Sequence, residues 1–276
     1  MKASVSQQRN SLGFRGPEPP RDLERRLSIV TIGGSTTECR FLTDGKTWPD
    51  VLAARLRASF PDVWLNNAGF DGHSTHGHLT LVRQVLVPLR PKVALFLVGA
   101  NDIGRSQHRP DLVLVPKPSA WRRLLATGID HVELLALAQN LWRFRDATRH
   151  GLGHAWTSIH CAPRLALTEA EIAARVDAYR PAVPGFRTCL QALVEFTRSS
   201  GIDPLLMTQP ALYPAVDPAT GVDTARLEVT VREDGPVNGD IDWRILELND
   251  DVTRDIAKTM GVFLIDLARV LSESGR

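Results

Sequence analysis

A short run of apolar and β-branched residues at 27–32 leads directly into Gly-Gly-Ser-Thr-Thr-Glu at 33–38. This pattern predicts a buried strand that ends in a tight turn carrying the hydroxyl of Ser35, with a helix soon after. In open α/β folds, ligand sites lie at the carboxyl edge of the sheet. Ser35 is therefore expected at the edge where such folds keep their sites.

The rest of the chain alternates predicted strands with predicted helices. Strands are expected at about 28–33, 63–66, 93–98, 205–208 and 262–266. Helices are expected from about 47, then at about 79–89, 186–199 and 242–259, the last after a Pro-rich loop that runs to about 240. Such alternation implies parallel strand pairing through right-handed crossovers, which is an α/β fold.

The alternation breaks after the third strand. Helical patterns near 119–126, 131–148 and 168–179 predict a helical insertion over about 105–184 that covers the strand ends. Aromatic residues in this insertion could line an acyl or sugar pocket, although simple packing is the more common role. These residues are Trp121, Trp142, Phe144 and Trp156.

Length and composition are typical of one large soluble domain. The chain has 276 residues and a net charge of +2, which gives no electrostatic signal for nucleic acid or an anionic membrane. Residues 1–27 are polar and rich in Arg, Pro and Gly, so we expect a flexible arm or linker before a domain at 28–276. Three widely spaced cysteines predict free thiols.

The sequence leaves the cellular compartment open. Its longest strongly apolar run, 93–98, has the length of a strand and is too short to span a membrane. A cytoplasmic location is the literal interpretation. An extracytoplasmic location fits equally if an N-terminal signal or anchor is missing.

Three polar loops follow the first three predicted strands. They are Gly34-Ser35, Asn67–Gly72 and Gly99–Asp102. Because the carboxyl ends of parallel strands share one edge, these loops are expected to converge. The arrangement fits acyl transfer: Ser35 is the candidate nucleophile, and the Ser35 N–H, the Gly72 N–H and the Asn101 amide are candidate oxyanion donors.

These three loops resemble the first three sequence blocks of the SGNH (GDSL-type) hydrolases, with Gly33-Gly34-Ser35 in place of the usual Gly-Asp-Ser, a variant associated with bacterial members. The family consists of esterases, lipases and carbohydrate-ester deacetylases. The resemblance implies a three-layer αβα sandwich around a flavodoxin-like, five-stranded parallel sheet of order 2-1-3-4-5. It also implies Ser35 as nucleophile, Gly72 and Asn101 completing the oxyanion hole, a small-molecule or carbohydrate ester as substrate, and no cofactor or metal.

The fourth block of the family, Asp-x-x-His, supplies the general base and is expected beyond the fifth strand. Ten residues follow Asp266 in this sequence, and the last histidine is His160. Two interpretations remain: a shortened form of a longer enzyme, or a natural pseudoenzyme. We favour the first, because the final helix that should cover the sheet is also expected beyond residue 276.

The functional alternatives follow from this missing block. A catalytically inactive module that binds acylated or carbohydrate ligands is the main alternative to a serine ester hydrolase. A flavodoxin-like nucleotide or flavin binder is a weaker one. Taken alone, Ser35 would most simply be a helix cap in an ordinary strand-to-helix turn; only the other two loops favour a nucleophile.

Several other polar residues have competing interpretations. His73, His76 and His78 could form a metal site or supply a replacement base, but a cluster at the rim of the site or at the start of a helix is favoured. Loop-ordering or structural roles are expected for a further set of polar residues. This set is Asn67, Asp71, Asp102 and Asp266.

Overall fold

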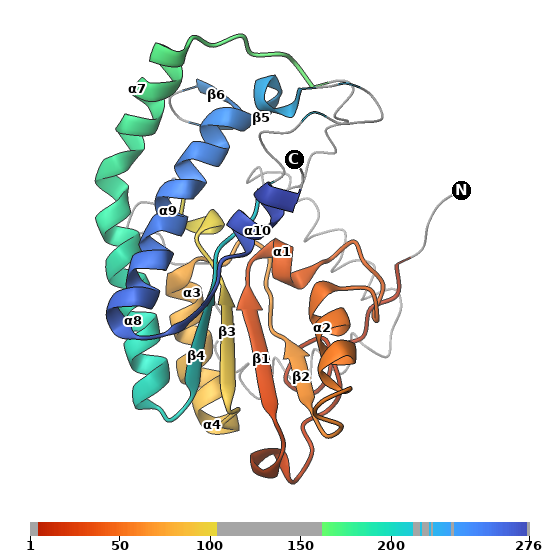
Figure 1. Cartoon of the computed structure of the whole chain (residues 1–276). Helices are drawn as coiled ribbons and strands as arrows, with labels where there is room; N and C mark the ends of the chain where they lie inside the picture. The colour runs from red at the N-terminus through yellow and green to blue at the C-terminus, as the bar shows by residue number, and fades with distance from the viewer. Residues whose placement is uncertain are drawn as a thin grey trace, which may run out of the picture. The chain divides into compact units, whose positions relative to one another are not determined.

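The computed structural model describes residues 5–103, 162–211, 216, 221, 223–232 and 235–274 (Figure 1). One compact unit comprises residues 1–112 and 163–276 and contains the sheet, and residues 113–162 form a second unit. The predicted helical patterns at 119–126 and 131–148 therefore lie outside the described residues, as do the four aromatic residues considered for a pocket.

Five parallel strands form the central sheet. In sheet order they are β2 (Trp64–Asn67), β1 (Ser28–Gly33), β3 (Val93–Leu97), β4 (Asp203–Met207) and β7 (Phe263–Ile265). Counting only these strands, the order is 2-1-3-4-5, so the predicted fold class is confirmed. Every residue of β1 is buried, as expected for a parallel sheet covered on both faces.

The sheet register aligns the carboxyl ends of the strands that carry the three loops. Gly33 of β1 lies opposite Leu97 of β3, and Leu97 lies opposite Met207 of β4. On the other side, Thr31 pairs with Asn67, the last residue of β2. The segments that follow β1, β2 and β3 therefore leave the sheet at one edge.

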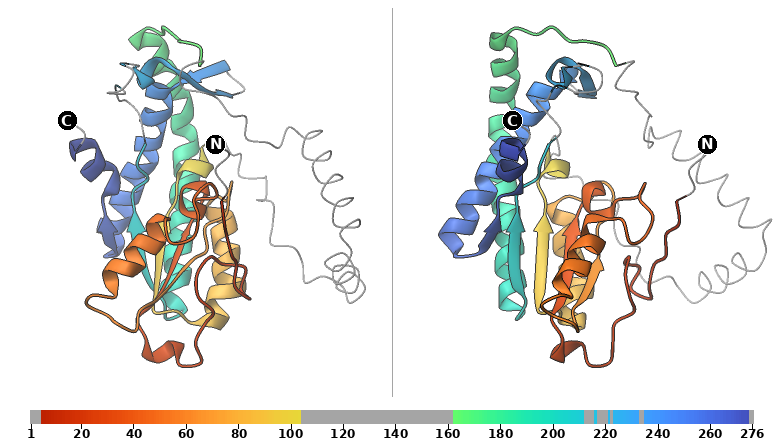
Figure 2. Two further views of the ribbon diagram at one scale, coloured as in Figure 1. Left: turned by 90° about the vertical axis from the view of Figure 1, so that its right-hand side faces the viewer. Right: turned by 45° about the vertical axis from the view of Figure 1, so that its right-hand side comes forward.

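Helices cover both faces of the sheet, with α2 on one side and α3, α8 and α9 on the other (Figures 1 and 2). Leu95 and Leu97 pack with Leu52 of α2, whereas Phe96 is fully buried on the opposite face, as strand alternation requires. The helices are α1 (Ser35–Glu38), α2 (Trp48–Leu56), α3 (Thr75–Leu81), a π-helical turn (Val82–Leu86), α4 (Val87–Leu89), α7 (Glu169–Tyr179), α8 (Val183–Ser199), α9 (Gly239–Met260) and α10 (Leu267–Ser274).

Local sequence explains where two of these helices begin. Thr47 caps α2 and forms a capping box with Asp50, and Pro49 occupies its first turn. Thr168 forms the same kind of capping box with Glu171 at the start of α7. Short 3₁₀ helices complete the described elements at Leu23–Arg25, Ala100–Asp102, Arg180–Ala182 and Thr224–Arg226.

Two expectations about the later part of the chain were wrong. An antiparallel hairpin of β5 (Glu228–Arg232) and β6 (Gly235–Asn238) occupies part of the region expected as a Pro-rich loop. A helix, α10, does follow the fifth parallel strand, and Leu267 at its start packs against Met207 and Ile265.

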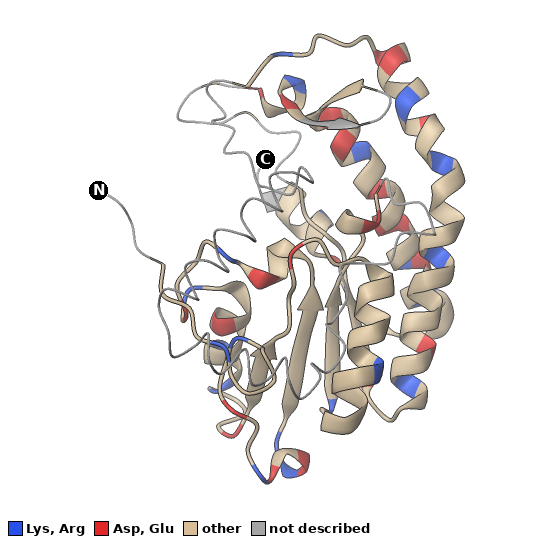
Figure 3. Cartoon of the chain, turned by 180° about the vertical axis from the view of Figure 1, so that it is seen from behind, with Lys and Arg blue, Asp and Glu red and all other residues tan. Residues whose placement is uncertain are grey.

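Charged residues of both signs are spread along α7, α8 and α9 (Figure 3). No described helix is long and apolar enough to cross a membrane. Residues 5–27 contact the sheet domain at several points: Phe14 and Arg15 are buried, and Arg15 forms an isolated bridge with Asn67. The expectation that residues 1–27 form a flexible arm or linker stays a prediction.

Candidate active site

Ser35 is the first residue of α1 and is separated from the end of β1 by Gly34 alone. The side chain is exposed, while Thr37 and Glu38 in the same turn are buried. The backbone N–H groups of Thr37 and Glu38 both donate to the carbonyl oxygen of Gly34, which closes the turn around Ser35. Ser35 is therefore exposed on a turn whose last two side chains are buried in the protein.

The three predicted loops converge at Gly34. The Asn101 amide nitrogen donates to the carbonyl oxygen of His73 at 3.0 Å, which joins the loop after β3 to the loop after β2. A Cβ atom placed on Gly34 would lie 2.1 Å from that same amide nitrogen. A side chain at position 34 would require the Asn101 amide to shift, so this amide lies directly beside the residue that precedes Ser35.

Gly72 lies next to His73 in the loop after β2. Its φ is +74°, a conformation that glycine adopts without strain. Gly69 in the same loop packs on the turn that carries Ser35, because a Cβ there would lie 2.2 Å from the Glu38 backbone nitrogen. The structure thus brings the loop that carries Gly72 into contact with the turn that carries Ser35.

Polar side chains hold these loops in place. The Asn67 amide nitrogen donates to the Thr37 carbonyl at 2.6 Å, and its oxygen accepts from the Gly69 N–H at 2.9 Å. Asp102 accepts from both the N–H and the hydroxyl of Thr75, at 3.1 and 2.6 Å. The loop-ordering roles predicted for Asn67 and Asp102 are confirmed.

The three clustered histidines lie around the start of α3, whose N-cap is Ser74. His73 and His78 are buried, with ring centroids 5.8 Å apart, and His76 is exposed with Nε2 3.1 Å from Cys189 Sγ. The prediction of a helix-start cluster is confirmed. Within the described part of the chain, no three His, Cys, Asp or Glu side chains are placed to hold a metal ion.

Asp266 has the structural role predicted for it. The carboxylate accepts from the Thr208 hydroxyl at 2.9 Å and from Nε and one terminal nitrogen of Arg254, both at 3.0 Å. Burial acts to raise the pKa of Asp266, but the hydrogen bonds from Arg254 and Thr208 hold the pKa below its usual value. The carboxylate joins the ends of β4 and β7 to α9.

Sequence reasoning missed a polar connection between α9 and the turn that carries Ser35. The Thr36 hydroxyl donates to the Gln209 side-chain oxygen at 3.2 Å, and the Gln209 N–H donates to the Asp250 carboxylate at 2.8 Å. Asp250 is buried on the inner face of α9 in line with Leu246 and Thr253. The sequence did hold one signal for it: an acidic residue on the helix face that includes Leu246 and Thr253.

Burial raises the pKa of Asp250 to about 8. The Gln209 N–H and the charge of Arg254 act against this shift, while the charges of Glu247 and Asp266 add to it. One carboxylate oxygen of Asp250 is buried and has no hydrogen-bond partner among the described residues, which a neutral acid tolerates better than a charged one. The folded state therefore favours protonated Asp250 at neutral pH.

Asp250 is expected to make stability fall as pH rises. An unfolded Asp titrates near pKa about 3.9, so between that value and about 8 the folded state binds the extra proton. The free energy of unfolding should decrease by about 1.4 kcal/mol per pH unit in this window from Asp250 alone. In Asp250→Asn this component should be absent, as urea unfolding at pH 5, 6, 7 and 8 can measure.

The matched control is Asp251→Asn, at an exposed position one residue further along α9. Its pH dependence should follow that of the wild type. Parallel pH curves for the wild type and Asp250→Asn would contradict the assignment of a buried, protonated acid.

Comparison with known proteins gives one family. The sequence model of the GDSL-like lipase/acylhydrolase family matches residues 31–276. A comparison with curated protein sequences gave no match. Similar solved structures include the psychrotrophic esterase EstA from Pseudoalteromonas sp., with 14% identity over 87% of this chain and 77% of that chain and a TM-score of 0.44.

Another similar structure is the acetyl xylan esterase AlAXEase, with 15% identity over 88% of this chain and 78% of that chain and a TM-score of 0.46. The family match covers most of the chain and includes the turn at Ser35 and the loops at Gly72 and Asn101. The chain belongs to the GDSL-like lipase/acylhydrolase family.

Proposed function

We propose that this protein is a serine ester hydrolase that acts through an acyl-enzyme on Ser35. The observation that carries the proposal is the placement of the Asn101 amide against the His73 carbonyl and beside Gly34, the residue that precedes the exposed Ser35. Family membership supports hydrolysis of an ester at the level of reaction class. The substrates proposed are small carboxylic esters or O-acylated carbohydrates.

In the proposed reaction, Ser35 Oγ attacks the ester carbonyl carbon while a general base takes the hydroxyl proton. The oxygen of the tetrahedral intermediate accepts hydrogen bonds from the Ser35 N–H, the Gly72 N–H and the Asn101 amide. An Asn amide nitrogen has two hydrogens, so Asn101 can keep its bond to His73 and still donate to the oxyanion. Collapse of the intermediate expels the alcohol, which receives the proton, and water then hydrolyses the acyl-serine.

By resemblance to the family, an Asp-x-x-His block after the fifth strand would supply the general base. Asp266 at the end of β7 is bound to Arg254 and Thr208, which argues against a role as the partner of a catalytic histidine. His73 and His76 are the replacement candidates within the described residues.

The proposal is tested with the full-length natural protein, p-nitrophenyl acetate and an acetylated xylo-oligosaccharide. We expect acetate release above the protein-free rate, and formation of acetohydroxamate when hydroxylamine is added, because hydroxylamine intercepts an acyl-serine. Hydrolysis without interception would contradict the acyl-enzyme. Saturable binding of the acetylated sugar without any acetate release would instead support the inactive binding module.

A further inference from the structure

The segment before the family match is tied to the site. We call residues 6–18 the N-terminal strap. Within it, the Arg15 N–H donates to the Asn67 carbonyl at 3.0 Å and the Asn67 N–H donates to the Arg15 carbonyl at 2.8 Å. Arg15 thus pairs with the last residue of β2, the strand from which the loop carrying Gly72 departs.

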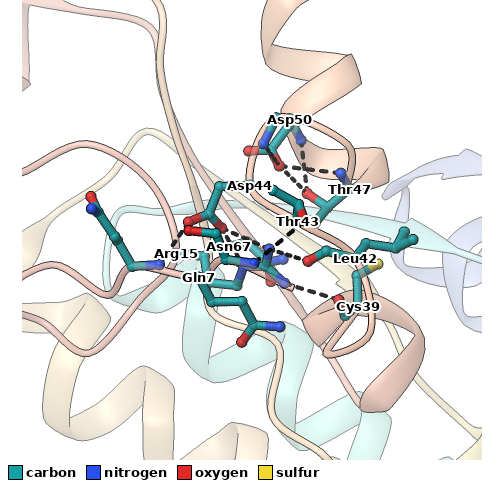
Figure 4. Close-up of polar contacts among 12 residues, drawn as sticks. Gln7, Arg15, Cys39, Leu42, Thr43, Asp44, Thr47, Asp50 and Asn67 are labelled. Carbon is teal, nitrogen blue, oxygen red and sulfur yellow. Dashed lines mark hydrogen bonds and ion pairs between the residues drawn. The ribbon is translucent and has the colours of Figure 1, made fainter. Parts of the chain in front are cut away.

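The guanidinium of Arg15 is almost fully buried, with 3% of the residue exposed. One terminal nitrogen donates to the carbonyls of Glu38 and Cys39, both at 2.9 Å, and the other donates to the Leu42 carbonyl at 2.8 Å. Nε and that second nitrogen also donate to Asp44 at 2.9 and 2.7 Å. All five N–H donors of the guanidinium are therefore used, as Figure 4 shows for part of this network.

Two of the carbonyls that accept hydrogen bonds from Arg15, those of Glu38 and Cys39, lie at the end of the turn that carries Ser35, which is the nucleophile turn of the proposed mechanism. Glu38 is the last residue of α1, and Cys39 after it has φ +50°, a left-handed conformation that is unfavourable for a residue other than glycine. A single helical turn of four residues cannot stabilise itself, because nucleation costs more than one turn of hydrogen bonds returns. Such a turn therefore needs hydrogen-bond donors for its last carbonyl groups.

The side chain of a second strap residue also contacts this turn. Arg9 donates to one carboxylate oxygen of Glu38 at 2.5 Å, and the other oxygen accepts from the Asp71 N–H at 2.9 Å. Glu38 is buried and connects the strap, the nucleophile turn and the loop next to Gly72. The strap therefore contacts the turn that carries Ser35 and, through Glu38, reaches the loop that carries Gly72, two of the three elements that supply the proposed oxyanion donors.

We propose that Arg15 is a positioning residue, which fixes the turn bearing Ser35 relative to the loop bearing Gly72 through its bonds to the carbonyls of residues 38, 39 and 42 and to β2. This inference rests on the proposed function for its catalytic consequence. The structural part of the inference does not depend on that function. It says that a segment outside the family match restrains the turn that carries Ser35.

Hydrogen–deuterium exchange tests the structural content without relying on activity. In Arg15→Gln, amides of residues 35–42 and 67–72 should exchange at least about 10-fold faster, whereas amides of β3 and β4 should keep their wild-type rates. The control is Arg26→Gln in the same N-terminal region, because Arg26 forms its ion pair with Asp22 at the surface. Unchanged exchange at 35–42, or equal acceleration throughout the sheet, would overturn the proposal.

Kinetics of the full-length protein test the catalytic consequence. Arg15→Gln should lower kcat for p-nitrophenyl acetate by about 10–100-fold with KM changed less than about 3-fold, since a displacement near 1 Å has that effect on rate. The kcat of Arg15→Lys should lie between those of the wild type and Arg15→Gln, because an ammonium group keeps the charge but cannot reproduce the planar fork of a guanidinium. In Arg15→Ala, added guanidinium at a non-denaturing concentration should restore part of kcat.

Two outcomes separate this inference from the proposed function. Suppose that Arg15→Gln speeds exchange only at residues 35–42 and 67–72 and that the wild type hydrolyses no ester. The structural role of Arg15 would then stand, and the ester hydrolase would be rejected. Wild-type hydrolysis with kcat unchanged in folded Arg15→Gln would keep the hydrolase and reject the positioning role.

Discussion

Replacing Ser35 with alanine is expected to lower kcat of the full-length protein for p-nitrophenyl acetate by roughly 10⁴–10⁶-fold, the range seen when a serine nucleophile is removed. The reason is that no covalent intermediate can form without Oγ. Binding should change little, so KM should stay near its wild-type value. Folding should be unaffected, because the Ser35 side chain is exposed and the turn is closed by backbone bonds to Gly34.

Ser199→Ala is the matched control for this variant. Ser199 lies at the end of α8, and its hydroxyl donates only to a carbonyl of its own helix, Phe196 at 3.0 Å. Its kcat should equal that of the wild type. A Ser35→Ala protein that keeps more than about one per cent of wild-type kcat would show that the nucleophile lies elsewhere.

Asn101→Ala is expected to lower kcat by about 10²–10³-fold, the usual cost of one oxyanion donor. KM should change little, since the donor acts on charge that develops only in the transition state. Loss of the Asn101 bond to the His73 carbonyl adds a local structural effect, which thermal unfolding measures separately. Steady-state kinetics with p-nitrophenyl acetate give the rate effect.

Asn101→Asp separates shape from hydrogen-bond donation. The aspartate has the same size but offers no N–H, and its charge would repel the oxyanion. Its kcat should therefore be as low as that of Asn101→Ala or lower. Wild-type kcat in a folded Asn101→Asp protein would remove Asn101 from the proposed oxyanion hole.

The sheet and the convergence of the three loops could be predicted because both follow from local patterns. The apolar strands at 28–33 and 93–98 are bounded by glycine-containing loops, and parallel connection places all their carboxyl ends on one edge. Once Ser35, Gly72 and Asn101 are assigned to those ends, they must lie in one region. The contact between Asn101 and Gly34 is the structural expression of that argument.

The remaining features depend on contacts between distant residues. Arg15 lies in a polar segment without periodicity, and nothing local indicates that its side chain would bind carbonyls at 38–42. The β5–β6 hairpin contains Pro236, which favoured an irregular loop, although Pro is compatible with a short two-stranded ribbon. Asp250 lies on the buried face of α9, and only the fold places it against Gln209.

The most direct test of the central claim is the mass of the protein after reaction with a fluorophosphonate ester, which phosphonylates an activated serine. The full-length wild type should gain one phosphonyl group, and peptide sequencing should place it on Ser35, while Ser35→Ala should gain none. A label on another residue, or equal labelling of Ser35→Ala, would contradict Ser35 as the nucleophile.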